Sequence, residues 1–374
     1  MTHAPRPLAR LVDDLPATVP FVAPEALERA RGEEFLVRVG ANESPFGPSP
    51  AAREAMAASI GRVGWYGDPE SHELRHELGR RLGTAPAHIA VASGIDDLLG
   101  LITRAFMDPG DVAVTSLGAY PTFNYHVQGY GGRLHRVPYR DDRNDLQALV
   151  GEAGGVGARL LYLANPDNPT GTWCAGADVE RLLDALPERC LLIFDEAYGE
   201  FAPEGTAPPV DPSDPRLVRV RTFSKAHGMA GARIGYAVAA EPVVAAFDRI
   251  RLHFGVNRVA QAGALASLRD EAFIAWVVGE VTRGRAEYER LAAGLGLATL
   301  PSATNFVAID CRSAAGSEAV VAALAERGVF VRRPQAPPLD RFIRVTVGEA
   351  PDRRAFAEAF TTVVARLGLT EKVG

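Results

Sequence analysis

Lysine is almost absent from this chain. Of the 40 Lys and Arg residues among its 374, 38 are arginine, and the two lysines are Lys225 and Lys372. Arginine keeps its proton at any working pH, whereas lysine can lose its proton, attack a carbonyl and form a Schiff base. Composition alone leaves two interpretations of Lys225 open. It is either a nucleophilic amine, or a lysine that remains by chance in a sequence that otherwise uses arginine.

Cysteine is also scarce, and no long segment is continuously apolar. The three cysteines, Cys174, Cys190 and Cys311, lie far apart, so they form no disulfide framework and favour a reducing compartment. The first 16 residues lack the apolar core of a signal peptide, and no apolar run reaches membrane-spanning length. The net charge of −6, without any basic run, argues against nucleic-acid binding. We therefore expect a cytoplasmic protein with neither a membrane nor a nucleic-acid partner.

Short apolar runs alternate with helical patterns from about residue 89 onward. Helices are predicted at 96–106 and 178–187. The predicted strands are 89–93, 111–116, 159–165, 190–198, 217–224 and 233–240. Apolar strands of this kind, separated by helices, are typical of a mostly parallel sheet that is covered on both faces. The sequence therefore predicts an α/β fold whose ligand binds beyond the carboxyl ends of the strands.

The rest of the chain predicts a smaller unit. Residues 258–294 are expected to be helical, and the first 40 residues, which show no sheet of their own, are expected to pack on this unit. Further elements are expected as strands at 305–310, 328–333 and 341–347 and helices at 316–327 and 351–367. We therefore predict a large domain of residues 41–250 and a small α+β domain of residues 1–40 and 251–374.

Polar segments follow four of the predicted strands. They are ASGIDD (92–97), NPDNPTG (165–171), FDEAY (194–198) and SK (224–225), and Arg233 comes soon after the last. Each alone is explained by a tight turn or a helix cap. Together they bring carboxylates, an amine, hydroxyls and a helix start suited to an anion to one edge of the sheet. The sequence therefore predicts a single ligand site there.

A His-Glu-x-x-His pattern at residues 72–76 is a possible zinc motif. The surrounding stretch is dense in charge, which is typical of a solvated helix face, and no further motif supplies a third ligand. We predict no metal site.

Seven motifs together resemble the fold-type I, class I/II aminotransferases, enzymes that use pyridoxal 5′-phosphate. The likeness extends in order over essentially the whole chain and is greatest to the histidinol-phosphate aminotransferase branch. The motifs are NESPFGPSP (42–50), YGDPES (66–71), NPDNPTG, FDEAYGEF (194–201), TFSKAHGMAGARIGY (222–236), PSATNF (301–306) and RVTVG (344–348). The resemblance implies a large domain with a mostly parallel seven-stranded sheet and a smaller α+β domain.

The resemblance also implies roles for the residues that would contact the cofactor ring. Lys225 would form the Schiff base and later move the proton between the substrate and the cofactor. Asp195 would pair with the ring nitrogen and keep it protonated. Asn168 and Tyr198 would hydrogen-bond the phenolate oxygen, and Tyr120 would stack on the ring. On this interpretation Lys225 is the nucleophilic amine and is not present by chance.

The cofactor phosphate would be held by a second set of residues. Backbone amides at Gly94 and Ile95 would bind it together with Ser224 and Arg233. Tyr66 would reach the phosphate of the other subunit. The resemblance therefore implies a homodimer as the working unit.

The candidate substrate residues are Arg344, Arg332, Asn42, Phe21 and Phe254. The resemblance implies that Arg344 binds a carboxylate with both guanidinium nitrogens. Arg332 lies on the preceding predicted strand, so we expect it to hold a second anion or a polar group. Phe21 and Phe254 stand where the branch tends to have tyrosines that bind the substrate phosphate. The expected reaction is transamination between histidinol phosphate and 2-oxoglutarate. An aromatic amino acid is the alternative substrate, and decarboxylation or oxidation with cyclisation is the alternative chemistry.

Overall fold

The largest element of the fold is a seven-stranded sheet. The structure is a computed structural model that describes residues 8–13, 15 and 22–370. In spatial order the strands are β2 (Ile89–Ala92), β8 (Gly235–Ala239), β7 (Leu217–Thr222), β6 (Leu191–Asp195), β5 (Leu160–Ala164), β3 (Val112–Ser116) and β4 (Arg133–Val137). Only β8 runs antiparallel to its neighbours. The carboxyl ends of the other six strands therefore share one edge, and the predicted mostly parallel sheet is confirmed.

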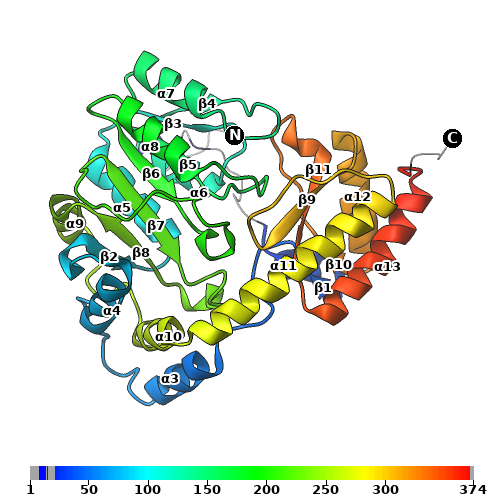
Figure 1. The fold of residues 1–374 in the computed structure, drawn as a ribbon, viewed down its shortest axis with the longest axis horizontal. Helices are drawn as coiled ribbons and strands as arrows, with labels where there is room; N and C mark the ends of the chain where they lie inside the picture. The colour runs from blue at the N-terminus through cyan, green and yellow to red at the C-terminus, as the bar shows by residue number, and fades with distance from the viewer. Residues whose placement is uncertain (1–7, 14, 16–21, 371–374) are drawn as a thin grey trace, which may run out of the picture.

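The two faces of this sheet are both buried, because successive residues of a strand point to opposite sides. On β6, Ile193 packs in a cluster with α5 (Ile95–Phe106), α6 (Pro121–Gly129) and α9 (Glu241–Asp248). Its neighbour Leu192 packs on the other face. The helices there are α7 (Leu146–Gly155) and α8 (Gly176–Ala185), while α4 (His72–Leu82) and α10 (Arg258–Arg269) cover the β2–β8 end. The apolar strands of the sequence are thus explained by a sheet between helical layers (Figure 1).

The sequence pattern identified six strands and missed β4. Its sequence, RLHRV, contains two arginines and a histidine, and of its residues only Val137 is fully buried. An edge strand can expose one face and one side to solvent, so it needs few apolar residues. Polar edge strands therefore give little signal in a search for apolar runs.

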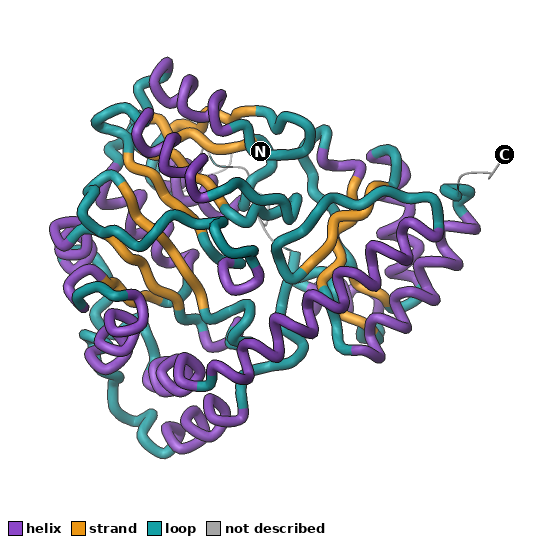
Figure 2. Tube along the Cα trace, viewed as in Figure 1, coloured by secondary structure: helices purple, strands orange, loops and turns teal. Residues whose placement is uncertain are grey.

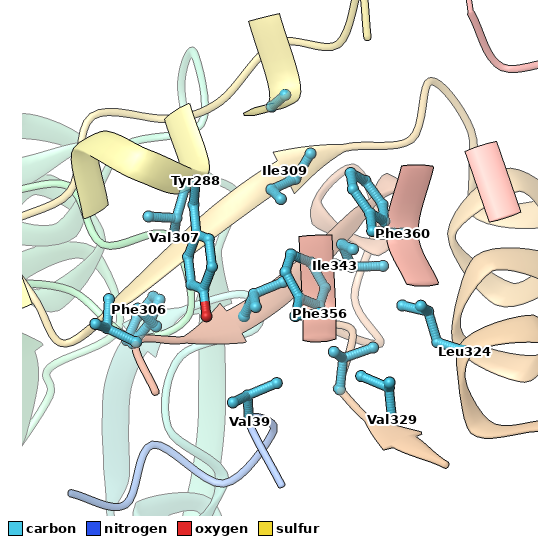
Figure 3. Packing of buried hydrophobic residues seen from close by; sticks show 14 of the residues in the cluster. Val39, Tyr288, Phe306, Val307, Ile309, Leu324, Val329, Ile343, Phe356 and Phe360 are labelled. Carbon is cyan, nitrogen blue, oxygen red and sulfur yellow. The ribbon is translucent and has the colours of Figure 1, made fainter. Parts of the chain in front are cut away.

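Two smaller sheets lie on the other side of the molecule (Figures 1 and 2). In one, β9 (Phe306–Asp310) pairs antiparallel with β11 (Phe342–Thr346); in the other, β1 (Val37–Arg38) pairs parallel with β10 (Val329–Phe330). They pack with α11 (Glu271–Gly294), α12 (Ala314–Glu326) and α13 (Ala350–Arg366) around a core that includes Tyr288, Phe306, Phe356 and Phe360 (Figure 3). The pairing of β1 with β10 joins Val37–Arg38 to this part of the fold. The domain limits at residues 40 and 250 stay a prediction.

The long helix predicted at 258–294 is interrupted. Asp270 ends α10 and begins α11, because its carboxylate accepts the amide of Phe273 at 3.3 Å as an N-cap. The remaining helices are α1 (Arg10–Asp13), α2 (Pro24–Arg31) and α3 (Pro50–Ile60), with 3₁₀ turns at Pro86–His88, Gly199–Phe201, Ala230–Ala232 and Leu339–Arg341. Within the described ranges, no helix is long and apolar enough to cross a bilayer.

Candidate active site

Four of the predicted site residues, Asn168, Asp195, Lys225 and Arg344, lie where the carboxyl edge of the large sheet faces β11. Asn168 follows β5, Asp195 ends β6 and Lys225 follows β7. From the other side, the guanidinium Nη1 of Arg344 on β11 donates to Asn168 Oδ1. Residues far apart in sequence are therefore brought together by the parallel register of the strands and by one bond between the two sheets.

Lys225 is a buried amine. Its Nζ donates to the carbonyl of Asn42 at 2.9 Å and lies 5.6 Å from the centre of the Tyr198 ring. Burial lowers the pKa of Lys225 to about 8, and the positive charge of Arg344 adds to this effect. At pH 7 about one amine in ten would then be neutral, against roughly one in three thousand for a solvated lysine. The site thus supplies the deprotonated amine that a nucleophile requires.

Asp195 is a buried carboxylate held by two neutral donors. Its Oδ2 accepts the hydroxyl of Tyr162 at 2.6 Å, and its Oδ1 accepts the amide of Ala197 at 2.9 Å. Burial raises the pKa of Asp195 to about 6, and the bonds from Tyr162 and Ala197 oppose the rise. The group is therefore charged at neutral pH, and since both donors are neutral its charge is suited to bind a cationic N–H group.

Asn42 connects Lys225 with Tyr198. Its Nδ2 donates to the Tyr198 hydroxyl at 2.9 Å, and its Oδ1 accepts from Thr346 Oγ1 at 3.1 Å. Its carbonyl, besides accepting from Lys225, accepts from Asn305 Nδ2 at 3.2 Å. Asn42 has φ of 55°, a conformation that asparagine tolerates better than most residues. In the structure Asn42 bonds the amine of Lys225 and the phenol of Tyr198. The substrate role that the sequence analysis gave to Asn42 stays a prediction.

A group of hydrogen-bond donors surrounds the start of α5. Gly94, with φ of 90°, precedes the helix, and a Cβ added to Gly94 would lie 2.7 Å from Arg233 Nη2. The first amides of the helix, from Ile95 onward, have no intrahelical acceptors. Ser224 Oγ lies 2.9 Å from Thr222 Oγ1, from which it accepts a hydrogen bond. Helix amides and a guanidinium around a glycine fit a phosphate group, and Ser224 follows β7, whose carboxyl end lies at the same edge of the sheet.

Asp96, in the first turn of α5, is an acceptor beside these donors that was not among the predicted site residues. Its Oδ1 accepts the hydroxyl of Tyr120 at 2.9 Å, and its Oδ2 accepts from Arg233 Nη2 at 3.2 Å. Asp96 therefore fixes both the aromatic ring and the guanidinium. The available signal was the pair of acids at the start of the helix, which helix-end electrostatics alone explains equally well.

Two arginines form the electropositive side of the site. Burial lowers the pKa of Arg344, whose Nε is buried without an acceptor among the described residues. Arg332 is joined to Arg344 through the backbone, since the Arg344 amide donates to the Arg332 carbonyl at 2.6 Å. Burial, and then the charge of Arg344, lower the pKa of Arg332 to about 10. Two partly desolvated guanidinium groups are suited to an anionic ligand.

Tyr66 and Phe254 lie apart from this network in the single chain. Their rings stack with centroids 4.4 Å apart, and the side chains are 75% and 51% exposed. Phe21 lies outside the described residues. The rings of His72 and His76, from the possible zinc motif, lie with their centroids 4.0 Å apart and their planes tilted by 38°.

Comparisons with known proteins agree with this geometry. The family model for aminotransferase class I and II matches residues 35–360. The chain is 38% identical over 357 residues to a histidinol-phosphate aminotransferase of Roseiflexus castenholzii, covering 92% of this chain and 94% of the relative. It is 46% identical to the crystal structure of a Sinorhizobium meliloti histidinol-phosphate aminotransferase in complex with pyridoxal 5′-phosphate. That match has a TM-score of 0.95 and covers 98% of this chain and all of the other.

More distant structures share the fold alone. The Thermus thermophilus aspartate aminotransferase with maleate is 23% identical and has a TM-score of 0.81, with 96% of this chain and 100% of that chain covered. The arrangement of a parallel seven-stranded sheet beside a smaller α+β part is thus the fold-type I architecture.

Proposed function

We propose, from the premise that this chain belongs to the aminotransferase class I and II family, that it exchanges an amino group between histidinol phosphate and 2-oxoglutarate. The chain is an aminotransferase, and its cofactor is pyridoxal 5′-phosphate. The observation that carries the proposal is the position of Lys225, a buried amine of lowered pKa near Tyr198 that follows β7, the strand paired with the Asp195 strand β6. Three unpaired cysteines in a chain of this class support a cytoplasmic location.

The cofactor, when bound, supplies an electron sink for the substrate's Cα–H bond. Lys225 would bind it covalently through Nζ and then move the proton at the substrate Cα. Asp195 would accept a hydrogen bond from the ring nitrogen, while Tyr198 and Asn168 would donate to the phenolate oxygen. Tyr120, fixed by Asp96, would lie against the ring.

The phosphate of the cofactor would bind at the start of α5. Amides of Gly94 and Ile95, the hydroxyl of Ser224 and the guanidinium of Arg233 would donate to its oxygens. The close approach of Arg233 to Gly94, where a Cβ would clash, supports this assignment.

Arg344 and Arg332 would select an anionic substrate. The buried Nε of Arg344 lacks an acceptor among the described residues, and a carboxylate of glutamate or 2-oxoglutarate would provide one. Arg332 would bind a second anionic group, either the other carboxylate or the phosphate of histidinol phosphate. Phe254 and Phe21 favour a second candidate, an aromatic amino acid, because neither ring can donate a hydrogen bond to phosphate.

The choice of substrate is tested by kcat/KM for histidinol phosphate and for phenylalanine, each with 2-oxoglutarate. We expect the value for histidinol phosphate to be higher. Arg332→Gln should lower it by about ten- to a hundredfold, because a hydrogen bond to a charged group is worth about 1.5–3 kcal/mol, and should affect phenylalanine less. If phenylalanine is preferred more than tenfold, the aromatic substrate replaces histidinol phosphate. Release of CO₂ instead of formation of glutamate would point to the alternative decarboxylation chemistry.

An exposed aromatic patch supports a homodimer. Two segments that meet where Tyr66 stacks on Phe254 carry large apolar side chains in contact with solvent. They are Ile60, Val63, Trp65, Tyr66, Leu252 and Phe254. Clusters of this kind mark interaction surfaces. We infer that a second copy of the chain covers this patch and that each Tyr66 hydroxyl reaches the cofactor phosphate of the other subunit.

Light scattering at assay concentration should therefore report twice 39.9 kDa. Trp65→Glu places a charge in the patch and should shift the protein toward a monomer with at least about tenfold lower activity. Leu36→Glu is the matched control, since Leu36 is 83% exposed outside the patch and its replacement should leave the dimer intact. A fully active monomer would contradict the shared site.

A further inference from the structure

Tyr162 lies in the core, under the proposed ring site. It occupies the middle of β5, is 1% exposed, and its ring stacks on Phe123 of α6 with centroids 5.0 Å apart and an interplanar angle of 15°. The register pairs Tyr162 with Ile193 and Ala164 with Asp195. Asp195 therefore lies two residues further along the neighbouring strand, on the same face as Tyr162. This diagonal relation lets the phenol reach the carboxylate.

The bond between the two side chains is short and fully buried. Tyr162 donates its hydroxyl to Asp195 Oδ2 at 2.6 Å, within the range of charge-assisted O–H···O⁻ bonds. The stacked Phe123 restricts the tilt of the ring. The amide of Ala197 holds the other oxygen of Asp195 at 2.9 Å. Two donors from different elements thus fix the plane of the carboxylate.

We propose that Tyr162 is a positioning residue that holds Asp195 in its ionised form, so that the proton shared with the cofactor rests on the ring nitrogen. This inference depends on the proposed role of Asp195. A hydroxyl donated to a carboxylate stabilises its charged form and lowers its affinity for a proton. Without Tyr162, burial remains while the donor is lost, and the shared proton should move from the ring nitrogen to Asp195.

The charges around Asp195 favour its protonated form, and the Tyr162 hydroxyl opposes them. Asp96 and Glu196 are both negative and both favour protonation of Asp195. Burial, the largest cause, acts in the same direction, and the Tyr162 hydroxyl is the strongest influence that lowers the pKa of Asp195. Tyr120 and Tyr198, the other phenols near this group, are neutral at working pH because burial raises the pKa of each. Among the described residues, no other side chain donates a hydrogen bond to the Asp195 carboxylate.

The test is Tyr162→Phe, which removes one oxygen and keeps the stack on Phe123. The holoenzyme is rebuilt with cofactor carrying ¹⁵N at the ring, and the nitrogen signal is recorded at pH 7 for wild type, Tyr162→Phe and Asp195→Asn. We expect Tyr162→Phe to move the signal toward the unprotonated form, part of the way to Asp195→Asn. Its kcat should fall about tenfold or more, while KM changes by less than about threefold, because one hydrogen bond to a charged group is lost.

Tyr139→Phe is the matched control. Tyr139 is also buried, and its hydroxyl donates to both oxygens of another buried carboxylate, Asp167, at 3.2 Å. Its replacement should leave the ring-nitrogen signal at the wild-type position. Phe123→Leu provides a second variant, in which the hydroxyl is kept but the ring is less restrained, and it should move the signal by a smaller amount.

The outcomes separate this inference from the proposed function. If Asp195→Asn leaves the ¹⁵N signal unchanged, Asp195 does not face the ring nitrogen and the proposed role fails. If Asp195→Asn moves the signal and Tyr162→Phe does not, only the inference about Tyr162 is overturned. In the protein without cofactor, infrared titration of the Asp195 carboxyl should give a midpoint about one pH unit or more higher in Tyr162→Phe than in wild type. An unchanged midpoint would also overturn the inference.

Discussion

Lys225→Ala is expected to abolish covalent attachment of the cofactor and to lower kcat by about five orders of magnitude or more, because no other group can replace the nucleophile and proton carrier. Borohydride reduction followed by peptide mapping should place the cofactor on Lys225 in the wild-type enzyme and nowhere in the variant. The chain offers a simple control, since Lys372 is its only other lysine. Lys372→Ala should keep full labelling and full activity.

The same attachment should depend on pH in a defined direction. Because burial lowers the pKa of Lys225 to about 8, the neutral amine becomes the major form above that pH. The rate at which cofactor-free protein captures the aldehyde should rise about tenfold per pH unit below 8 and level off above it. A midpoint near the ordinary lysine value would show that the amine is solvated, and labelling of Lys372 would remove Lys225 from the site.

The sequence predicted the place of the site because its signal is local. A buried parallel strand reads as an apolar run, and the polar residue that follows must lie at the carboxyl edge of the sheet. Asp195, Lys225 and the turn before Gly171 all follow this rule. The family resemblance then supplied the roles, which one sequence without chemical context could not.

The supporting residues could not be predicted, because their partners depend on register. Tyr162 lies within the apolar run of β5 and reads as an ordinary core aromatic; only the pairing of β5 with β6 places its hydroxyl beside Asp195. Asn305 and Thr346 occur in recognised motifs, yet their bonds to Asn42 cross 263 and 304 residues of sequence. Contacts between residues so far apart in the sequence produce no periodic pattern in it. For the same reason the sequence could not predict the bonds of Asn42 to Lys225 and Tyr198.

Asp195 and its neighbour Glu196 show two ways to bury a carboxylate. Glu196 accepts Arg219 Nε and Nη2, each at 2.8 Å, with Arg221 at 3.5 Å. Burial alone would raise its pKa, but Arg221 and Arg219 hold the pKa of Glu196 below its usual value. Asp195 has only neutral donors, and burial raises its pKa. Glu196 is therefore a satisfied structural charge, whereas Asp195 keeps a charge that the fold alone does not compensate.

Because the charge of Asp195 is not compensated by the protein, replacing Asp195 is the second change for which we expect a large effect. Asp195→Asn should still bind the cofactor, but kcat should fall about a thousandfold or more, equivalent to roughly 4 kcal/mol, because the carboxylate that stabilises developing charge is lost. The cofactor-free variant should be at least as stable as wild type at pH 7. At pH 7, above the Asp195 pKa of about 6, the wild-type carboxylate is ionised although it is buried. This desolvated charge costs free energy of folding, which the neutral amide avoids.

Glu196→Gln should behave in the opposite way. It leaves Arg219 and Arg221 without their counter-charge, which costs about 3–5 kcal/mol for a buried pair, so the melting temperature should fall while kcat stays within about tenfold of wild type. Melting curves of the cofactor-free proteins and steady-state kinetics of the rebuilt enzymes measure both quantities. If Asp195→Asn keeps kcat within about tenfold, another group protonates the ring nitrogen. If it also melts well below wild type, its carboxylate is structural, and the assignment of its charge to the cofactor is wrong.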